Sequence, residues 1–149
     1  DFDAMNLMVH DQRLFMIDFQ DAVAGPLSYD LISLLRGRYC RFSDEEFSDF
    51  VSAFYQQARR DGRLPSRVDF ATFLIQCHAM AAQRSLKVLG IFCRLTLRDQ
   101  KSGYLECLPH FLDHLEDSLS FLTEQTDFTE WVTLTFRPAL MKRLAEMTP

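Results

Sequence analysis

The first nineteen residues constrain this chain more than any other stretch. Asp1 and Asn6 are separated by four residues, and a short apolar run follows Asn6. A polar turn then leads into a second apolar run, which ends on Asp18. Two short apolar runs joined by a polar turn predict a β-hairpin, here over residues 5–9 and 14–19. We therefore expect a hairpin that positions the side-chain oxygens of Asp1, Asn6 and Asp18.

These three side chains are of the types that phosphoryl transfer uses. The carboxylate of Asp1 could accept a proton from an attacking hydroxyl, while oxygens of Asn6 and Asp18 could hold Mg²⁺ against nucleotide phosphates. Mg²⁺ prefers oxygen ligands and keeps several waters, so two protein oxygens suffice beside the phosphates. The structural alternatives are a solvated chain end for Asp1, an Asx turn for Asn6 and a strand-end cap for Asp18.

The same spacing resembles the catalytic loop of kinases. In that loop an Asp is followed by four residues and an Asn, and a metal-binding Asp follows the next strand. On this reading the chain begins at the Asp of the loop. The stretch that starts at Asp18 continues with Phe19, Gln20 and Asp21 instead of the Phe-Gly of protein kinases, which points away from that family.

Three short motifs refine the resemblance: Ile17-Asp18-Phe19, Gly25-Pro26 and Tyr29-Asp30-Leu31. Together they resemble the aminoglycoside phosphotransferase-like family of small-molecule kinases. Residues 17–26 and 83–92 are most similar to one branch, the bacterial anomeric kinases of N-acetylmuramate and N-acetylglucosamine, which serve cell-wall recycling.

The resemblance implies an ATP-dependent kinase with Mg²⁺ as cofactor, of which residues 1–149 are the helical C-terminal lobe. Asp1 would be catalytic, Asn6 and Asp18 would hold the metal and nucleotide, and Asp30 would support the catalytic loop through hydrogen bonds. The sequence has no glycine-rich phosphate loop, so the N-terminal nucleotide-binding lobe is expected to be absent and this fragment inactive alone.

Further residues are candidates for contact with a sugar substrate. Gln20 and Asp21 directly follow the metal-binding Asp, and a polar loop explains them equally well. Arg84 and Lys87 begin a cationic stripe on one helix, which could attract a phosphate or a lactyl carboxylate; a solvated face is the alternative. The stripe continues with Arg94 and Arg98. An aminoglycoside is a polycation and would favour acidic walls, so the stripe favours a neutral or anionic sugar.

One position departs from the family pattern. Gly37 stands where a carboxylate is common, which puts in doubt a substrate role for its helix.

Composition excludes several classes of protein. A formal net charge of −5 over 149 residues argues against a general nucleic-acid binder. No apolar run approaches the roughly 18 residues of a membrane span. The four cysteines form no C-x-x-C pair, so reduced, buried thiols in a cytoplasmic protein are expected. His110 and His114 have a spacing that can bind zinc, but an exposed polar face is the commoner reading.

The remaining pattern predicts a mainly α-helical lobe built on the hairpin. Ser28 could cap the first helix, and Ser43 and Glu46 form a capping box for the second. Gly90 lies inside a long helix, where it could permit a close backbone approach or mark a kink. The predicted helices cover residues 29–40, 44–60, 68–97, 104–123, 127–135 and 138–147.

The first functional hypothesis is an amino-sugar anomeric kinase. Within the same fold, an aminoglycoside, choline or homoserine kinase is the alternative. A non-catalytic helical binding remnant is the alternative of a different class.

Overall fold

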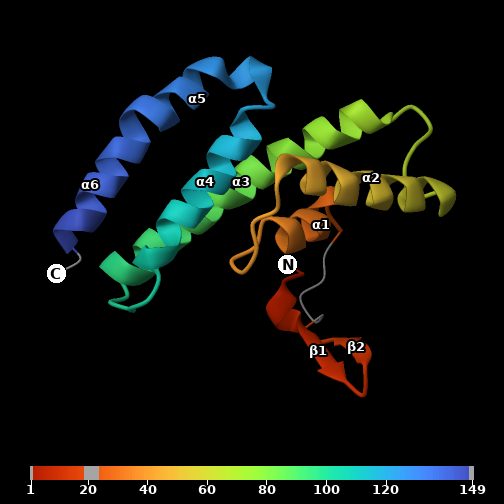
Figure 1. The fold of residues 1–149 in the computed structure, drawn as a ribbon, viewed down its shortest axis with the longest axis horizontal. Helices are drawn as coiled ribbons and strands as arrows, with labels where there is room; N and C mark the ends of the chain where they lie inside the picture. The colour runs from red at the N-terminus through yellow and green to blue at the C-terminus, as the bar shows by residue number, and fades with distance from the viewer. Residues whose placement is uncertain (1, 19–23, 148–149) are drawn as a thin grey trace. The chain divides into compact units, whose positions relative to one another are not determined.

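The computed structural model describes residues 2–18 and 24–147. This part of the chain is mainly α-helical with one antiparallel hairpin, so the predicted fold class is confirmed (Figure 1). The chain divides into two compact units, Asp1–Met80 and Ala81–Pro149. The strands and helices are β1 (Leu7–His10), β2 (Arg13–Met16), α1 (Ser28–Leu35), α2 (Asp44–Arg60), α3 (Phe70–Leu97), α4 (Leu108–Leu119), α5 (Thr126–Trp131) and α6 (Arg137–Met147).

The predicted hairpin is confirmed, and it closes through a tight turn. Asp11 has φ of 47° and Gln12 has φ of 59°. Positive φ at both central residues is the requirement of a type I′ turn, whose twist matches that of the flanking strands. The resulting register pairs Leu7 with Met16 and continues to the turn.

Helix α1 is shorter than the predicted helix over residues 29–40. Arg36 leaves the helical conformation, with φ of −118° and ψ of 33°, while its N–H still donates to the carbonyl of Ile32. A Cβ atom at Gly37 would lie 3.0 Å from the carbonyl oxygen of Ser33. The chain therefore turns away from the helix axis at a place where a residue without a side chain fits best.

The two predicted helix caps have different outcomes. The capping box of α2 is confirmed: the Glu46 N–H donates to Ser43 Oγ over 3.2 Å, and the Ser43 N–H donates to Glu46 Oε2 over 2.9 Å. The cap predicted at Ser28 is wrong, because Leu27 already has helical dihedrals and Ser28 is buried in the first turn.

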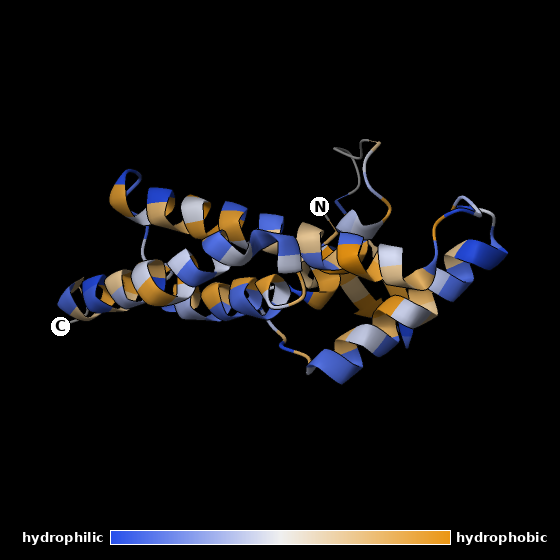
Figure 2. Cartoon of the chain, turned by 90° about the horizontal axis from the view of Figure 1, so that it is seen from above, coloured by the Kyte–Doolittle hydropathy of each residue, from blue (hydrophilic) through white to orange (hydrophobic). Residues whose placement is uncertain are grey.

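Helix α2 is amphipathic, as its apolar spacing predicts. Phe47, Val51 and Ala58 are buried, whereas Phe50 is exposed and packs edge-on against the ring of Phe42. Figure 2 shows hydrophobic and hydrophilic residues alternating along the helices, as burial of one helix face requires.

A cation and an imidazole are buried beside this aromatic core. The guanidinium of Arg36 lies 4.4 Å from the centroid of the Phe47 ring, and the ring of His78 lies 5.1 Å from the same centroid. Burial, and after it the positive charge of Arg36, lowers the pKa of His78 to about 4, while the negative charge of Asp44 opposes the shift. His78 is therefore neutral at pH 7.

The second unit has its own hydrophobic core. It joins Leu89 of α3 to Phe111, Leu112 and Leu115 of α4, and Val132 packs into the same cluster. These side chains are all buried. The core therefore depends on the apolar stripe of α4, which packs against α3 and against the segment that contains Val132.

Two details of these helices concern Gly90 and Pro109. Helix α3 is continuous through Gly90, and a Cβ atom there would meet nothing within 4 Å, so the close backbone approach is wrong. Pro109 lies in the first turn of α4, where its missing N–H costs no hydrogen bond.

The C-terminal helical run is continuous, whereas the sequence predicts two separate pieces. Between α5 and α6 lies a π-helical segment, Val132–Phe136, in which the Arg137 N–H donates to the carbonyl of Val132. Pro138 has no N–H to donate and its ring would crowd an ordinary helical turn. The wider π turn accommodates the proline without breaking the helix.

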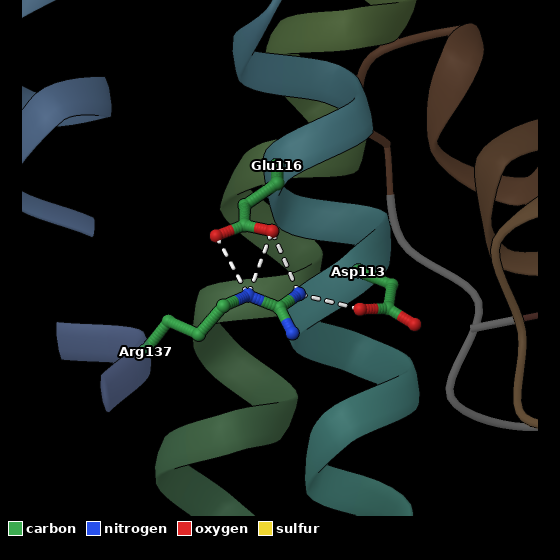
Figure 3. A network of polar contacts seen from close by, with 3 residues as sticks. All are labelled: Asp113, Glu116 and Arg137. Carbon is green, nitrogen blue, oxygen red and sulfur yellow. Dashed lines mark hydrogen bonds and ion pairs between the residues drawn. The ribbon is translucent and has the colours of Figure 1, made fainter. Parts of the chain in front are cut away.

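Arg137 links α6 to α4 through two carboxylates (Figure 3). Its Nε lies 2.8 Å from both carboxylate oxygens of Glu116, and one terminal nitrogen lies 2.5 Å from Asp113 Oδ1. The three side chains are partly buried. The hydrogen bonds that Arg137 donates to the two carboxylates, with that to Glu116 first, raise the pKa of Arg137.

The cysteines are free thiols. Cys77 is buried, and burial raises its pKa to about 12, whereas Cys40, Cys93 and Cys107 are only partly buried. In the residues that the structure describes, no helix is long and apolar enough to cross a membrane.

We expect stability to fall as the pH drops from 6.5 to 4 because of His78. The unfolded imidazole takes up a proton near pH 6.5, and the folded one only near pH 4, so acidification favours the unfolded chain in this window. Replacing His78 by Gln removes this dependence. Between pH 7.5 and pH 5, urea unfolding should show wild type losing about 2 kcal/mol relative to His78→Gln. A constant difference would contradict the buried neutral imidazole.

We also expect Arg137→Met to destabilise the fold by about 1–3 kcal/mol, because it leaves two neighbouring carboxylates without their shared cation. The matched control is Arg143→Met, which breaks an exposed pair with Glu146 and should cost under about 0.5 kcal/mol. Urea unfolding measures both. Equal losses would show that the Arg137 contacts add nothing beyond a surface ion pair.

Candidate functional site

The open end of the hairpin brings two of the predicted site residues into proximity. Beyond the Leu7–Met16 pair, the N–H of Ile17 donates to the carbonyl of Asn6 over 2.9 Å. Asn6 therefore lies opposite Ile17, one residue before Asp18. The backbone pairing thus places a carboxamide and a carboxylate at the same end of the sheet.

A short 3₁₀ turn, Ala4–Asn6, fixes the backbone in front of β1. The carboxylate of Asp3 accepts from the Met5 N–H over 3.1 Å, and the carbonyl of Asp3 accepts from the Asn6 N–H over 2.9 Å. Asp3 is therefore engaged as the local cap of this turn.

Asp18 has an uncommon backbone conformation for a residue with a side chain. Its φ is 62°, which lies in the left-handed region that Asp and Asn tolerate better than most residues. Such conformations cost free energy and cluster at active sites and ligand clamps. Asp18 is exposed, two residues after the end of β2.

Asp30 contacts the segment that precedes the hairpin. Its Oδ1 accepts a hydrogen bond from the Phe2 N–H over 3.1 Å, across 28 residues of sequence. Asp30 lies in the first turn of α1 and is exposed. The bond attaches the backbone of Phe2 to the start of a helix, which is the type of contact that the resemblance implies for Asp30.

Three predicted site residues, Asp1, Gln20 and Asp21, lie outside the described residues. Their roles stay predictions.

The cationic stripe on α3 is not a single exposed face. Lys87 is exposed, but Arg84 is only 9% exposed. Arg84 is not part of an exposed face because this part of the helix is covered on a wide arc, which also buries Ala81 and Ser85. The two candidates belong to the unit Ala81–Pro149, so their contact with substrate stays a prediction.

The two histidines of α4 are not an exposed polar face either. His114 is completely buried and His110 partly so. Their Nε2 atoms lie 3.0 Å apart, so one imidazole donates a hydrogen bond to the other. Among residues 2–18 and 24–147, no group of three or more His, Cys, Asp or Glu side chains could hold a metal ion.

The oxygen donors at the hairpin nevertheless suit Mg²⁺. Asn6 and Asp18 supply a neutral and an anionic oxygen, and Mg²⁺ binds through few protein oxygens and completes its shell with water and phosphate. The fit rests on the chemistry of these donors and on their common position at one end of the sheet.

The sequence analysis did not identify the residues of the loop between α1 and α2 as candidates for the site. The predicted helix over residues 29–40 includes Gly37 and Arg38. In the structure α1 ends at Leu35, and Arg38, Tyr39 and Arg41 are exposed in the loop. The glycine between two arginines is the signal that could have indicated the early end.

Comparison with known proteins confirms the resemblance drawn from the sequence. Residues 1–70 match the phosphotransferase enzyme family. The chain is 44% identical over 115 residues to the N-acetylmuramate/N-acetylglucosamine kinase of Neisseria meningitidis serogroup B, a match that covers 77% of this chain and 34% of the relative. Proteins of the same name from Pseudomonas putida and Pseudomonas aeruginosa are 31% identical over 132 residues and 32% identical over 130 residues.

These matches are partial. The two Pseudomonas matches cover 89% and 87% of this chain but 39% and 38% of the relatives. The chain therefore spans between about a third and two fifths of the length of these relatives.

We expect Asp30→Ala to loosen the segment around Phe2, because the Phe2 N–H loses its acceptor. Amide hydrogen exchange at Phe2 should accelerate about tenfold, the effect of losing one net hydrogen bond. Asp49→Ala, which removes an exposed carboxylate from α2, is the control and should leave that amide unchanged. Equal exchange in wild type and Asp30→Ala would rule out the anchoring contact.

Proposed function

Because residues 1–70 match the phosphotransferase enzyme family, we propose that this chain is part of an ATP-dependent small-molecule kinase. The observation that carries the proposal is the bond between Ile17 and Asn6, which holds Asn6 and Asp18 at one end of the hairpin. Two oxygen donors at that position are the requirement for a magnesium–nucleotide site.

We further propose that a nucleotide-binding lobe covers the hairpin in the whole protein. Seven apolar side chains in and beside the hairpin are between 42% and 73% exposed in this chain, and large exposed apolar patches mark contact surfaces. A two-stranded hairpin is also marginal alone. The exposed residues are Met5, Met8, Val9, Leu14, Phe15, Met16 and Ile17. The relatives have ample additional length to supply such a lobe.

In the proposed mechanism, Asp1 orients the acceptor hydroxyl and takes its proton. Asn6 and Asp18 would hold Mg²⁺, which supplies positive charge against the phosphoryl group when bound. Asp30 keeps the backbone beside Asp1 in place through the Phe2 N–H. Gln20 and Asp21 follow the metal site in sequence and would contact the sugar.

The acceptor that we propose is the anomeric hydroxyl of N-acetylmuramate or N-acetylglucosamine, because the relatives carry the names of kinases for both sugars. Such an enzyme would act in the recycling of cell-wall sugars. We place it in the cytoplasm, where ATP is available and where free thiols such as those of this chain persist.

The test is a panel of sugars with radiolabelled ATP and the full-length protein. We expect phosphorylation of N-acetylmuramate and N-acetylglucosamine, and little with aminoglycosides, choline or homoserine. Asp1→Asn should reduce kcat by at least about two orders of magnitude, as loss of a general base does. Wild-type turnover in Asp1→Asn would remove Asp1 from the mechanism.

The metal role has a separate readout. Asn6→Ala should raise the Mg²⁺ concentration needed for half-maximal activity, because one oxygen ligand is lost. Gln12→Ala, a change in the turn at the other end of the hairpin, is the control. If the Mg²⁺ dependence of both variants matched wild type, Asn6 would not be a ligand.

A further inference from the structure

We propose that Arg38 and Arg41, in the loop between α1 and α2, bind the carboxylate of an anionic acceptor sugar and so distinguish it from neutral sugars. The inference rests on the proposed function and names the specificity residues of that site. Arg38 and Arg41 take the place of Arg84, which is buried, as candidates for the contact with a carboxylate.

Helix α1 separates the loop with Arg38 and Arg41 from the N-terminal segment by a distance that one sugar substrate can span. The N-terminal segment is attached at Asp30 through the Phe2 N–H, and the loop begins at Arg36, six residues later (Figure 1). At a rise of 1.5 Å per residue, this separation is about 9 Å along the helix. One sugar ring and an arginine side chain together can bridge it.

Two contacts hold the loop, one made by a residue at its centre and one made near its second end. Cys40 Sγ lies 3.6 Å from the carbonyl oxygen of Leu34 in α1, and the Phe42 ring lies 5.0 Å from that of Phe50 in α2. After burial, the negative charge of Asp3 is the second cause that raises the pKa of Cys40. The centre of the loop is therefore within electrostatic range of the segment that precedes β1.

The charge of the loop suits an anion. No Asp or Glu occurs from residue 31 to 43, whereas three arginines do, in a chain with a formal net charge of −5. Arg36 is buried over the Phe47 ring and serves the core. Arg38 and Arg41 are exposed, and a guanidinium matches a carboxylate with two parallel hydrogen bonds.

Exposed Tyr39 completes the surface between the two cations. It is 59% exposed, and an aromatic face beside polar groups can pack against the apolar side of a sugar ring. The loop thus offers contacts to both parts of an acidic sugar.

The two sugars of the proposed function provide an internal comparison. N-acetylmuramate carries a lactyl carboxylate, and N-acetylglucosamine has a hydroxyl in its place. A residue that binds the carboxylate affects only the first sugar, whereas a residue that supports the fold or the reaction affects both.

The experiment compares wild type with the double variant Arg38→Gln/Arg41→Gln in the full-length protein. We expect KM for N-acetylmuramate to rise at least about tenfold, the loss typical of a charge-assisted contact, with kcat unchanged. KM for N-acetylglucosamine should change less than about twofold. Arg38→Lys/Arg41→Lys should recover part of the affinity, and Arg67→Gln, another exposed cation of the same unit, should change nothing.

Equal changes for both sugars, or no change for either, would overturn the inference. Calorimetric binding of N-acetylmuramate without ATP separates it from the proposed function. If wild type phosphorylates neither sugar, the proposed function fails, and binding alone decides the inference: weaker binding to the double variant supports it, and unchanged or absent binding to wild type and variant overturns it.

Discussion

The antiparallel register of β1 and β2 is the constraint on which the candidate site depends. A shift by one residue would separate Asn6 from Ile17 and turn every strand side chain to the opposite face. Burial does not select the register here, because the strand residues are largely exposed. The turn at Asp11 and Gln12 does, since two consecutive residues with positive φ close the hairpin in one way.

Helix α1 acts as a support with two functional ends. In its first turn, Asp30 accepts a hydrogen bond from Phe2 in the segment before the hairpin. After its last turn, the loop that contains Arg38 and Arg41 begins at Arg36. Eight residues of helix therefore set the separation between the proposed catalytic and specificity groups. The unit Ala81–Pro149 has a hydrophobic core and an Arg137 network of its own.

The sequence predicted features that depend on local chemistry. The capping box at Ser43 and the hairpin follow from hydrogen bonding and sterics within a few residues. The early end of α1 and the continuous helix past Pro138 did not follow, because each depends on a backbone adjustment that residue type alone does not specify. Burial of Arg84 and His114 depends on which helices pack against them.

The sequence by itself determined the helical class, the order of the elements and the spacing of Asn6 and Asp18, because hydrophobic period and turn chemistry are local. Only the tertiary structure decided that Asp30 reaches Phe2, that Arg137 joins two carboxylates of α4, and that Arg38 and Arg41 lie in a loop. Contacts between residues distant in the chain follow from packing and from where helices end. Both are settled by competition among many side chains and not by any one motif.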